Sequence, residues 1–183
     1  MNIRTEAGLT LYFNALAFSS AAHKRQRRKN KDATPYINHP VQVSTILFNA
    51  GERDAILLAS ALLHDVTEDC GVSKAQLAKL FGAEVADLVE EVSDDKSLDK
   101  AVRKQLQIEH AATLSPRAKK LKLADKIANV IDVLREAPEG WSLDRRLDYT
   151  DHAHAVFNKI KGQNRKLDRQ FSELYTRRHE LIM

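Results

Sequence analysis

The sequence contains few of the residues that build cross-linked or fibrous proteins. Of its 183 residues, one is cysteine, four are proline and six are glycine. The single cysteine, Cys70, excludes an intramolecular disulfide framework and a cysteine-rich zinc module, and is typical of a reducing compartment. No internal repeat is visible, so we do not expect a solenoid.

Long apolar runs are missing as well. The longest one, Ala55–Leu63, already contains Ser60 and is far shorter than the roughly 20 residues that a helix needs to cross a bilayer. The charged residues Arg4 and Glu6 precede the first apolar stretch and Asn14 interrupts it, which is not the pattern of a signal peptide. We therefore expect a cytoplasmic protein without a membrane partner.

Hydrophobic residues make up 43% of the chain and recur at intervals of three and four, the spacing of helices that bury one face. We predict an all-α fold with one domain over residues 1–183, a helical bundle. The expected helices cover residues 6–24, 39–50, 53–64, a short stretch after 73, 83–92, a segment from about 99, 116–135, 143–160 and 164–181. Two helix starts have specific signals. Ser73 and Gln76 match a capping box, and Ser115 precedes Pro116 at a first helical position.

Two expectations about burial follow from local pattern alone. The first predicted helix carries an apolar stripe that we expect to face the core, formed by Leu9, Tyr12, Phe13, Leu16 and Ala17. Histidines flanked by charged or polar residues are expected at the surface, namely His23, His110 and His179.

Positive charge is concentrated in one segment. Residues 24–31 include six Lys and Arg side chains, so the rest of the chain carries a net charge of −2 against +4 for the whole. Such a segment could bind nucleic acid, an acidic lipid surface or a phosphorylated small molecule, or it could be a solvated loop.

An imidazole and a carboxylate follow the most apolar segment. Ala55–Leu63 is apolar on every side, which is typical of a buried helix, and His64 and Asp65 come directly after it. Burying both groups destabilises a fold by several kcal/mol unless each finds a partner. A shared hydrogen bond would satisfy both, and so would a divalent metal ion, for which imidazole and carboxylate are common ligands.

Two further residues favour the metal ion. His39 opens one predicted helix and Asp125 lies at the edge of the apolar face of another, so both could meet His64 and Asp65. Two imidazoles and two carboxylates leave room for water around an octahedral ion. Mn²⁺ suits this set better than Mg²⁺, which prefers oxygen ligands, whereas structural zinc more often has cysteine ligands.

Two acids stand four residues beyond this pair. If the helix continues for another turn, Glu68 lies above His64 and Asp69 above Asp65. A carboxylate beside a metal-bound water can accept its proton. The alternative is that both are loop acids before Gly71, although the helix dipole disfavours acids at a helix C-terminus.

Three motifs together resemble the HD-domain hydrolases of the alarmone (p)ppGpp, in the RelA/SpoT superfamily. They are residues 36–40 (YINHP), 64–69 (HDVTED) and 123–126 (LADK), the last followed by Asn129. The resemblance runs in order from about residue 15 to 166, and the length is that of the stand-alone small hydrolases of the Mesh1 type. It implies an HD-type helical bundle with a buried Mn²⁺ site, in which Glu68 and Asp69 activate and orient the attacking water. The implied reaction releases pyrophosphate from the ribose 3′ position, leaving GDP or GTP.

The resemblance also implies a nucleotide site. The residues that it assigns to substrate binding are Arg28, Lys29, Asn129, Tyr149, Lys100 and Arg145. A substrate with five or six negative charges needs such basic partners. Lys100 could instead be a solvated lysine, and Tyr149 could simply pack between helices. The family usually has an arginine where this chain has Ile131, and the loop over residues 30–33 is longer than in the long enzymes.

Other readings of the sequence remain open. The same metal site could act on an adenine alarmone or on the 2′-phosphate of NADPH. A different class of function is a nucleic-acid-binding module that uses residues 24–31, with affinity that falls steeply as salt rises and no need for a metal. That reading leaves the metal and carboxylate positions unexplained, so we expect a nucleotide as partner and no nucleic acid.

Overall fold

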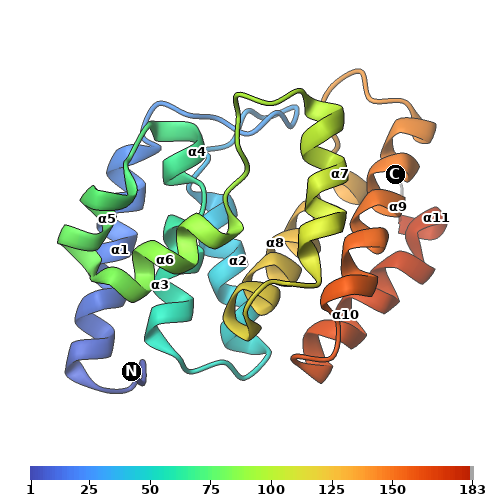
Figure 1. Cartoon of the computed structure of the whole chain (residues 1–183). Helices are drawn as coiled ribbons and strands as arrows, with labels where there is room; N and C mark the ends of the chain where they lie inside the picture. Colours follow the sequence, from blue (N-terminus) through green and yellow to red (C-terminus); the bar gives the residue numbers. More distant parts are fainter. Residues whose placement is uncertain (182–183) are drawn as a thin grey trace.

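The computed structural model describes residues 1–181. Their regular secondary structure is helical, apart from isolated bridges between Asn2 and Asp54 and between Arg27 and Pro35 (Figure 1). The helices are α1 (Glu6–Ala22), α2 (Asn38–Asn49), α3 (Ala55–Leu63), α4 (Val66–Cys70), α5 (Lys74–Phe81), α6 (Ala83–Val92), α7 (Lys100–Ala111), α8 (Pro116–Arg135), α9 (Leu143–Ile160), α10 (Arg165–Thr176) and α11 (Arg178–Leu181). The predicted all-α fold is confirmed for this part of the chain.

Local signals set several of the helix starts. At α5, the Ser73 side chain accepts from the backbone of Gln76 and the Gln76 side chain accepts from the backbone of Ser73, which completes the predicted capping box. At α8, Ser115 caps the helix and Pro116 occupies the first turn. Each cap satisfies backbone N–H groups that have no partner within the helix.

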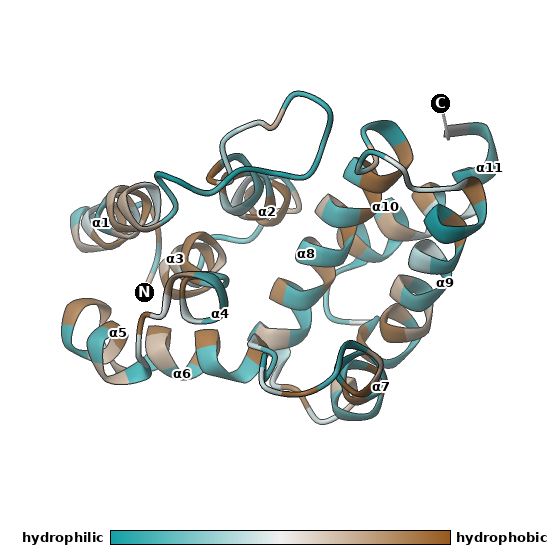
Figure 2. Cartoon of the chain, turned by 90° about the horizontal axis from the view of Figure 1, so that it is seen from above, coloured by the Kyte–Doolittle hydropathy of each residue, from teal (hydrophilic) through white to brown (hydrophobic). Residues whose placement is uncertain are grey.

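Helix α3 is the centre of the N-terminal half. All of its residues are buried, and it packs against α1, α2 and α6 (Figure 2). Its leucines Leu57, Leu58, Leu62 and Leu63 are at most 1% exposed. Burying each such side chain stabilises the fold by about 1.5–3 kcal/mol. A helix held on all sides gives the residues at its C-terminal end a fixed position.

Helix α8 joins the two halves of the structure. It contacts α2, α3 and α6 on one side and α9 and α10 on the other (Figure 2). Its middle therefore lies beside the N-terminal end of α2 and the C-terminal end of α3, where the sequence predicted a metal site. Among the described residues, no helix combines the length and apolar character that a membrane-spanning segment requires.

The buried face of α1 differs from the predicted stripe. Leu9 is 44% and Phe13 is 60% exposed, whereas Gly8, Ala15 and Ser19 are buried. The N-terminal segment explains part of this difference. It packs so closely against Gly8 that a Cβ there would lie 2.2 Å from the carbonyl oxygen of Asn2. Small side chains allow a close approach that the larger apolar ones would prevent. The stripe prediction was wrong for Leu9, Phe13 and Ala17, whereas Tyr12 and Leu16 do pack against the core, because the partners of a helix decide which face is buried.

One predicted helix ends as expected and another is interrupted. The helix predicted over residues 53–64 is observed as Ala55–Leu63, and a separate short helix, α4, follows it. The predicted final helix over residues 164–181 is divided into α10 and α11 at Arg177, whose φ of −92° and ψ of 9° leave the helical region. The end of α3 and the start of α4 lie at the candidate site.

Candidate metal centre and catalytic pocket

Three elements bring the candidate metal ligands together. His39 lies in the first turn of α2, where Pro40 is tolerated because its missing N–H would have no helical partner. His64 and Asp65 form the break between α3 and α4, and Asp125 lies in the middle of α8. One ligand atom from each of His39, His64 and Asp125 lies within 4.8 Å of the others.

Asp65 joins the same group. Its Oδ2 lies 3.2 Å from Nε2 of His64 and 3.7 Å from Nε2 of His39. Oδ1 of Asp125 lies 3.2 Å from Nε2 of His39 and 3.7 Å from Nε2 of His64. Two ring nitrogens and two carboxylate oxygens therefore face one another in a largely buried space.

The hydrogen bonds of His64 favour a cation between these groups. Its Nδ1 lies 2.8 Å from the carbonyl oxygen of Ala61, which can only accept, so Nδ1 carries the proton. Nε2 of the neutral ring then presents a lone pair, and it is buried with no hydrogen-bond partner among the described residues. Since carboxylates also only accept, the donor set fits a divalent metal ion of the first transition row.

The pKa values of the metal-free site follow from the same geometry. Burial alone would lower the pKa of His64, but Asp65 and Asp125 outweigh it and raise the pKa to about 9. Burial would raise the pKa of Asp125, but the nearby imidazoles of His39 and His64 and the charge of Lys126 hold it well below its ordinary value. Without a metal ion, a proton on His64 therefore neutralises part of the negative charge.

Two further side chains orient the carboxylates. The hydroxyl group of Tyr36 donates to Oδ2 of Asp65 at 2.7 Å, and burial followed by the charge of Asp65 raises the pKa of Tyr36, so the phenol stays protonated. Nδ2 of Asn129 donates to Oδ1 of Asp125 at 2.6 Å. The sequence reading gave Tyr36 no role of its own. Its position three residues before His39 was the available signal.

Glu68 and Asp69 lie on α4, beside the candidate ligands. The condition for their predicted place, a continuing α3, is not met, because the chain breaks at His64 and Asp65. The backbone N–H of Asp69 still donates to the carbonyl oxygen of Asp65 at 2.9 Å, which keeps one helical turn between them. Both acids line a cavity of about 200 Å³, here called the inner cavity, together with His39, His64, Asp65 and Asp125.

The two acids differ in their protonation equilibria. Burial raises the pKa of Glu68 above its ordinary value, although the N–H of Asp94 opposes this effect. Burial would also raise the pKa of Asp69, but hydrogen bonds from Gln26 and Lys96 outweigh it and lower the pKa. Glu68 is therefore the better proton acceptor of the pair, because an acceptor works best when its pKa approaches the working pH.

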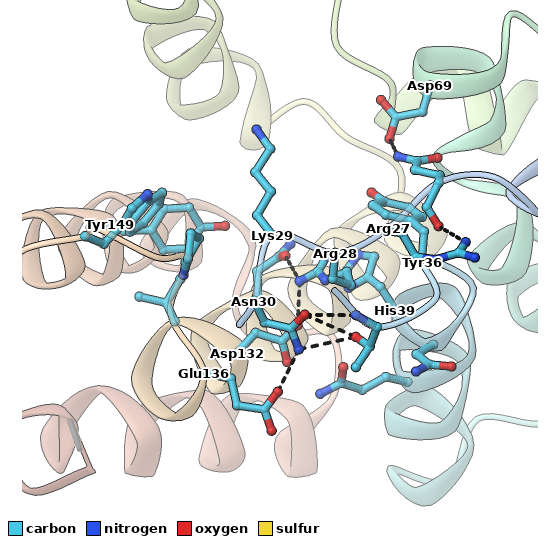
Figure 3. A pocket seen from close by; sticks show the side chains of 18 of the residues that line it. Arg27, Arg28, Lys29, Asn30, Tyr36, His39, Asp69, Asp132, Glu136 and Tyr149 are labelled. Carbon is cyan, nitrogen blue, oxygen red and sulfur yellow. Dashed lines mark hydrogen bonds and ion pairs between the residues drawn. The ribbon is translucent and has the colours of Figure 1, made fainter. Parts of the chain in front are cut away.

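A larger cavity of about 580 Å³, the outer cavity, adjoins the inner one (Figure 3). Residues that line both are Tyr36, His39, Asp69, Lys96, Asn129 and Tyr149. Arg28 and Lys29 line the outer cavity only. Arg28 forms an ion pair with Asp132, and its Nη2 also lies 3.4 Å from Oδ1 of Asn129.

The basic segment is folded over α8. The backbone N–H of Arg28 donates to the carbonyl oxygen of Thr34 at 2.8 Å, which closes a loop. Asn30 then donates to Oε2 of Glu136 at 2.9 Å and ties this loop to the end of α8 (Figure 3). The segment therefore forms one wall of the outer cavity. The alternative that these basic residues form a solvated loop was wrong for Arg28, which is paired with Asp132.

Lys100 and Arg145 lie outside the lining of both cavities. The guanidinium group of Arg145 stacks at 4.4 Å on the ring of Trp141, which does line the outer cavity. Burial, then Lys104, Arg145 and Lys29, lowers the pKa of Lys100. Lys29, Lys100 and Arg145, here called the basic rim, are therefore electrostatic neighbours. The ring of Trp141 lies 5.9 Å from the ring of Tyr149.

The prediction for His23 was wrong, whereas His110 and His179 are exposed as predicted. His23 is 2% exposed, and its Nδ1 lies 2.6 Å from Oε1 of Gln26. Its ring lies 4.9 Å from the ring of Tyr36. Charged neighbours in sequence did not predict its burial, because the loop after α1 folds back and covers the ring.

The fold and this cluster define a helical protein with a candidate metal centre of two histidines and two aspartates. A family model described as "HD domain" matches residues 15–166. A human protein, guanosine-3′,5′-bis(diphosphate) 3′-pyrophosphohydrolase MESH1, is 46% identical over 165 residues, 90% of this chain and 92% of the human one. The protein of the same name from Drosophila melanogaster is 45% identical over 168 residues, 91% of this chain and 94% of its own.

A solved structure supports the same grouping. It is reported as "A metazoan ortholog of SpoT hydrolyzes ppGpp and plays a role in starvation responses", and it matches with a TM-score of 0.89 at 44% sequence identity, covering 92% of this chain and 95% of the other. The chain therefore belongs to the HD domain family and to its MESH1-type branch.

Proposed function

We propose that the protein hydrolyses the alarmone (p)ppGpp, releasing pyrophosphate from the ribose 3′ position and leaving GDP or GTP. The observation that carries this proposal is the junction of the two cavities. The candidate metal centre lies in the inner cavity, and a basic wall with Tyr149 and Trp141 lines the outer cavity. The MESH1 proteins, whose names state this activity, are about 45% identical over nine-tenths of the chain.

His39, His64, Asp65 and Asp125 would hold the metal ion, for which we propose Mn²⁺ because nitrogen and oxygen donors are mixed. A divalent ion there would polarise the phosphoryl oxygens and lower the pKa of a bound water. The lone pair of Nε2 on His64 and the carboxylates held by Tyr36 and Asn129 support this assignment.

Glu68 is proposed as the general base. Its carboxylate would take a proton from the attacking water as the bond from water oxygen to phosphorus forms and the bond to the ribose 3′-oxygen breaks. The departing 3′-oxygen would take up a proton from solvent to give the 3′-hydroxyl of GDP or GTP. Asp69, with its lowered pKa, stays ionised and would orient the water by accepting a hydrogen bond. The shared lining of the inner cavity supports this division of roles.

Arg28 and Lys29 would bind the nucleotide phosphates from the wall of the outer cavity. Asp132 holds the Arg28 side chain in place, which reduces the entropy lost on binding. Asn129 and Tyr149, which line both cavities, would contact the nucleoside, and Lys100 and Arg145 would attract phosphates from the basic rim.

The test is a turnover assay with the purified full chain. ppGpp is incubated with Mn²⁺, with Mg²⁺ or with a chelator, and pyrophosphate and GDP are quantified by ion-exchange chromatography. We expect equal amounts of both products with Mn²⁺, slower release with Mg²⁺ and none with the chelator. Parallel reactions contain an adenine alarmone or NADPH, and faster turnover of either would overturn the substrate assignment.

A further inference from the structure

Lys96 contacts both acids of the proposed catalytic pair. It lies on the loop between α6 and α7, far from α4 in sequence. Its Nζ is 3.2 Å from Oε2 of Glu68 and 3.1 Å from Oδ1 of Asp69. One ammonium group therefore bridges two adjacent carboxylates, and neither the motifs nor the comparisons assign it a role.

The other oxygen of each carboxylate is held by a different element. Oε1 of Glu68 accepts from the backbone N–H of Asp94 at 2.7 Å, and Oδ2 of Asp69 accepts from Nε2 of Gln26 at 2.9 Å. Because one oxygen of each carboxylate is restrained in this way, the contact with Lys96 fixes the position of the other oxygen and so the orientation of the carboxylate. Asp94 and Lys96 come from the same loop, so this loop fixes Glu68 at both oxygens.

The conformation of the loop is itself restrained. Oδ1 of Asp95 accepts from the backbone N–H of Ser97 at 2.9 Å and from its hydroxyl group at 2.6 Å. The backbone N–H of Leu98 donates to the carbonyl oxygen of Asp95 at 3.2 Å. This turn around Lys96 presents its side chain to α4 and limits the number of conformations that the loop adopts.

Burial distinguishes this contact from an ordinary surface ion pair. The side chains of Glu68 and Asp69 are 14% and 20% exposed, and that of Lys96 is 46% exposed. Lys96 therefore covers the pair from the open side and lines both cavities. By contrast, the pair between Lys74 and Asp87 has side chains that are 50% and 64% exposed.

We propose that Lys96 is a positioning residue of the reaction: its ammonium group holds the Glu68 and Asp69 carboxylates in the orientation in which Glu68 takes the proton of the attacking water. The inference rests on the proposed function and extends it. Without a cation between them, two neighbouring carboxylates repel each other and turn apart, and the inner cavity already holds Asp65 and Asp125.

The direct test compares Lys96→Met and Lys96→Arg with the wild type in the ppGpp assay with saturating Mn²⁺. We expect Lys96→Met to lower kcat by about 10- to 100-fold, because an unoriented base loses most of its effect. KM should change by less than about threefold, and Mn²⁺ affinity by calorimetry and the melting temperature should stay at wild-type values. Lys96→Arg should recover part of kcat, and the surface control Lys74→Met should match the wild type.

A double-mutant cycle separates positioning from a structural effect. If Lys96 acts through Glu68, then Lys96→Met should slow the Glu68→Gln variant by less than about twofold. The acid limb of the kcat profile should also move to higher pH in Lys96→Met. The pKa of Glu68 rises there because the charge of Lys96 no longer opposes burial and the charges of Asp65 and Asp94, and only the backbone N–H of Asp94 still lowers it.

Several outcomes would overturn the inference. A wild-type kcat in Lys96→Met would show that Lys96 does not position the Glu68 and Asp69 carboxylates. A raised KM with unchanged kcat would indicate that Lys96 binds the substrate phosphates instead. Additive losses in the double mutant would reduce it to a structural residue. A wild type that hydrolyses no ppGpp would overturn the proposed function, and the role of Lys96 with it.

Discussion

The side chains of the candidate metal centre and those of the basic rim are held in different ways. The side chains of His39 and His64 are 2% and 7% exposed, and each aspartate of the centre accepts a hydrogen bond from a neighbouring side chain. Lys29 and Lys100 of the rim are exposed, and their side chains form no ion pair within the described residues. The difference indicates that packing fixes the geometry of the metal centre, whereas Lys29 and Lys100 contribute positive charge without an ion-pair partner that fixes their side chains.

The strongest way to break this comparison is to remove a buried ligand. His64→Ala should abolish Mn²⁺ binding and lower turnover of ppGpp by at least about 1,000-fold, because a three-ligand site loses both the ion and the polarised water. Calorimetry and the pyrophosphate assay measure the two losses together. The exposed His179→Ala is the control, and wild-type turnover in His64→Ala would refute the metal assignment.

The next largest effect concerns the general base. Glu68→Gln should keep Mn²⁺ affinity and lower kcat by about 100- to 10,000-fold, since an amide cannot accept the proton. Single-turnover kinetics of ppGpp hydrolysis checks this loss apart from product release. Glu90→Gln, on the exposed face of α6, should behave as the wild type. A normal rate for Glu68→Gln would mean that another group takes the proton.

The positive charge of Arg28 in the outer cavity should affect the binding of ppGpp. Arg28→Ala should raise KM for ppGpp by about 10- to 100-fold, as loss of a charge-assisted hydrogen bond predicts, and change kcat by less than about threefold. Arg25→Ala is the matched control, because Arg25 belongs to the same basic segment but does not line the outer cavity. Equal effects of both variants on steady-state kinetics would show that the segment acts only through its total charge.

The smallest change to the protein is the loss of one proton, which makes metal binding depend on pH. The pKa of His64 in the metal-free protein is about 9, so this ring is protonated near neutral pH and must lose its proton to bind the ion. Apparent Mn²⁺ affinity should therefore rise about tenfold per pH unit between pH 6.5 and 8.5 and level off above pH 9. Calorimetry in buffers of different ionisation enthalpy should record the released proton. A flat affinity would contradict the raised pKa.

Local sequence predicted the helices well because local forces build them. The capping box at Ser73, the start of α8 at Pro116 and the burial of α3 are all confirmed. The motifs also named candidate ligands that the fold brings together. The end of α3 near His64 was predicted, but the apolar pattern left open whether another helical turn follows. The structure has a break at His64 and Asp65 before α4 begins.

The misses share a cause. The burial of His23, the contact of Tyr36 with Asp65 and the rotation of α1 all depend on groups from other elements. Lys96 lies in a charged loop with no periodicity, and its partners are on α4. These residues contact groups that are distant in sequence, so a local sequence pattern does not predict the contacts.

The sequence by itself determined which segments are helical, because backbone hydrogen bonds and caps join residues a few positions apart. It also supplied the imidazoles, acids and cations from which a hydrolytic site can be built. Only the tertiary structure decided which of these groups meet. The packing of α3 against α8 places their polar residues around one buried point. The loop before α7 places Lys96 against Glu68 and Asp69, which are too distant in sequence for local interactions to bring them together.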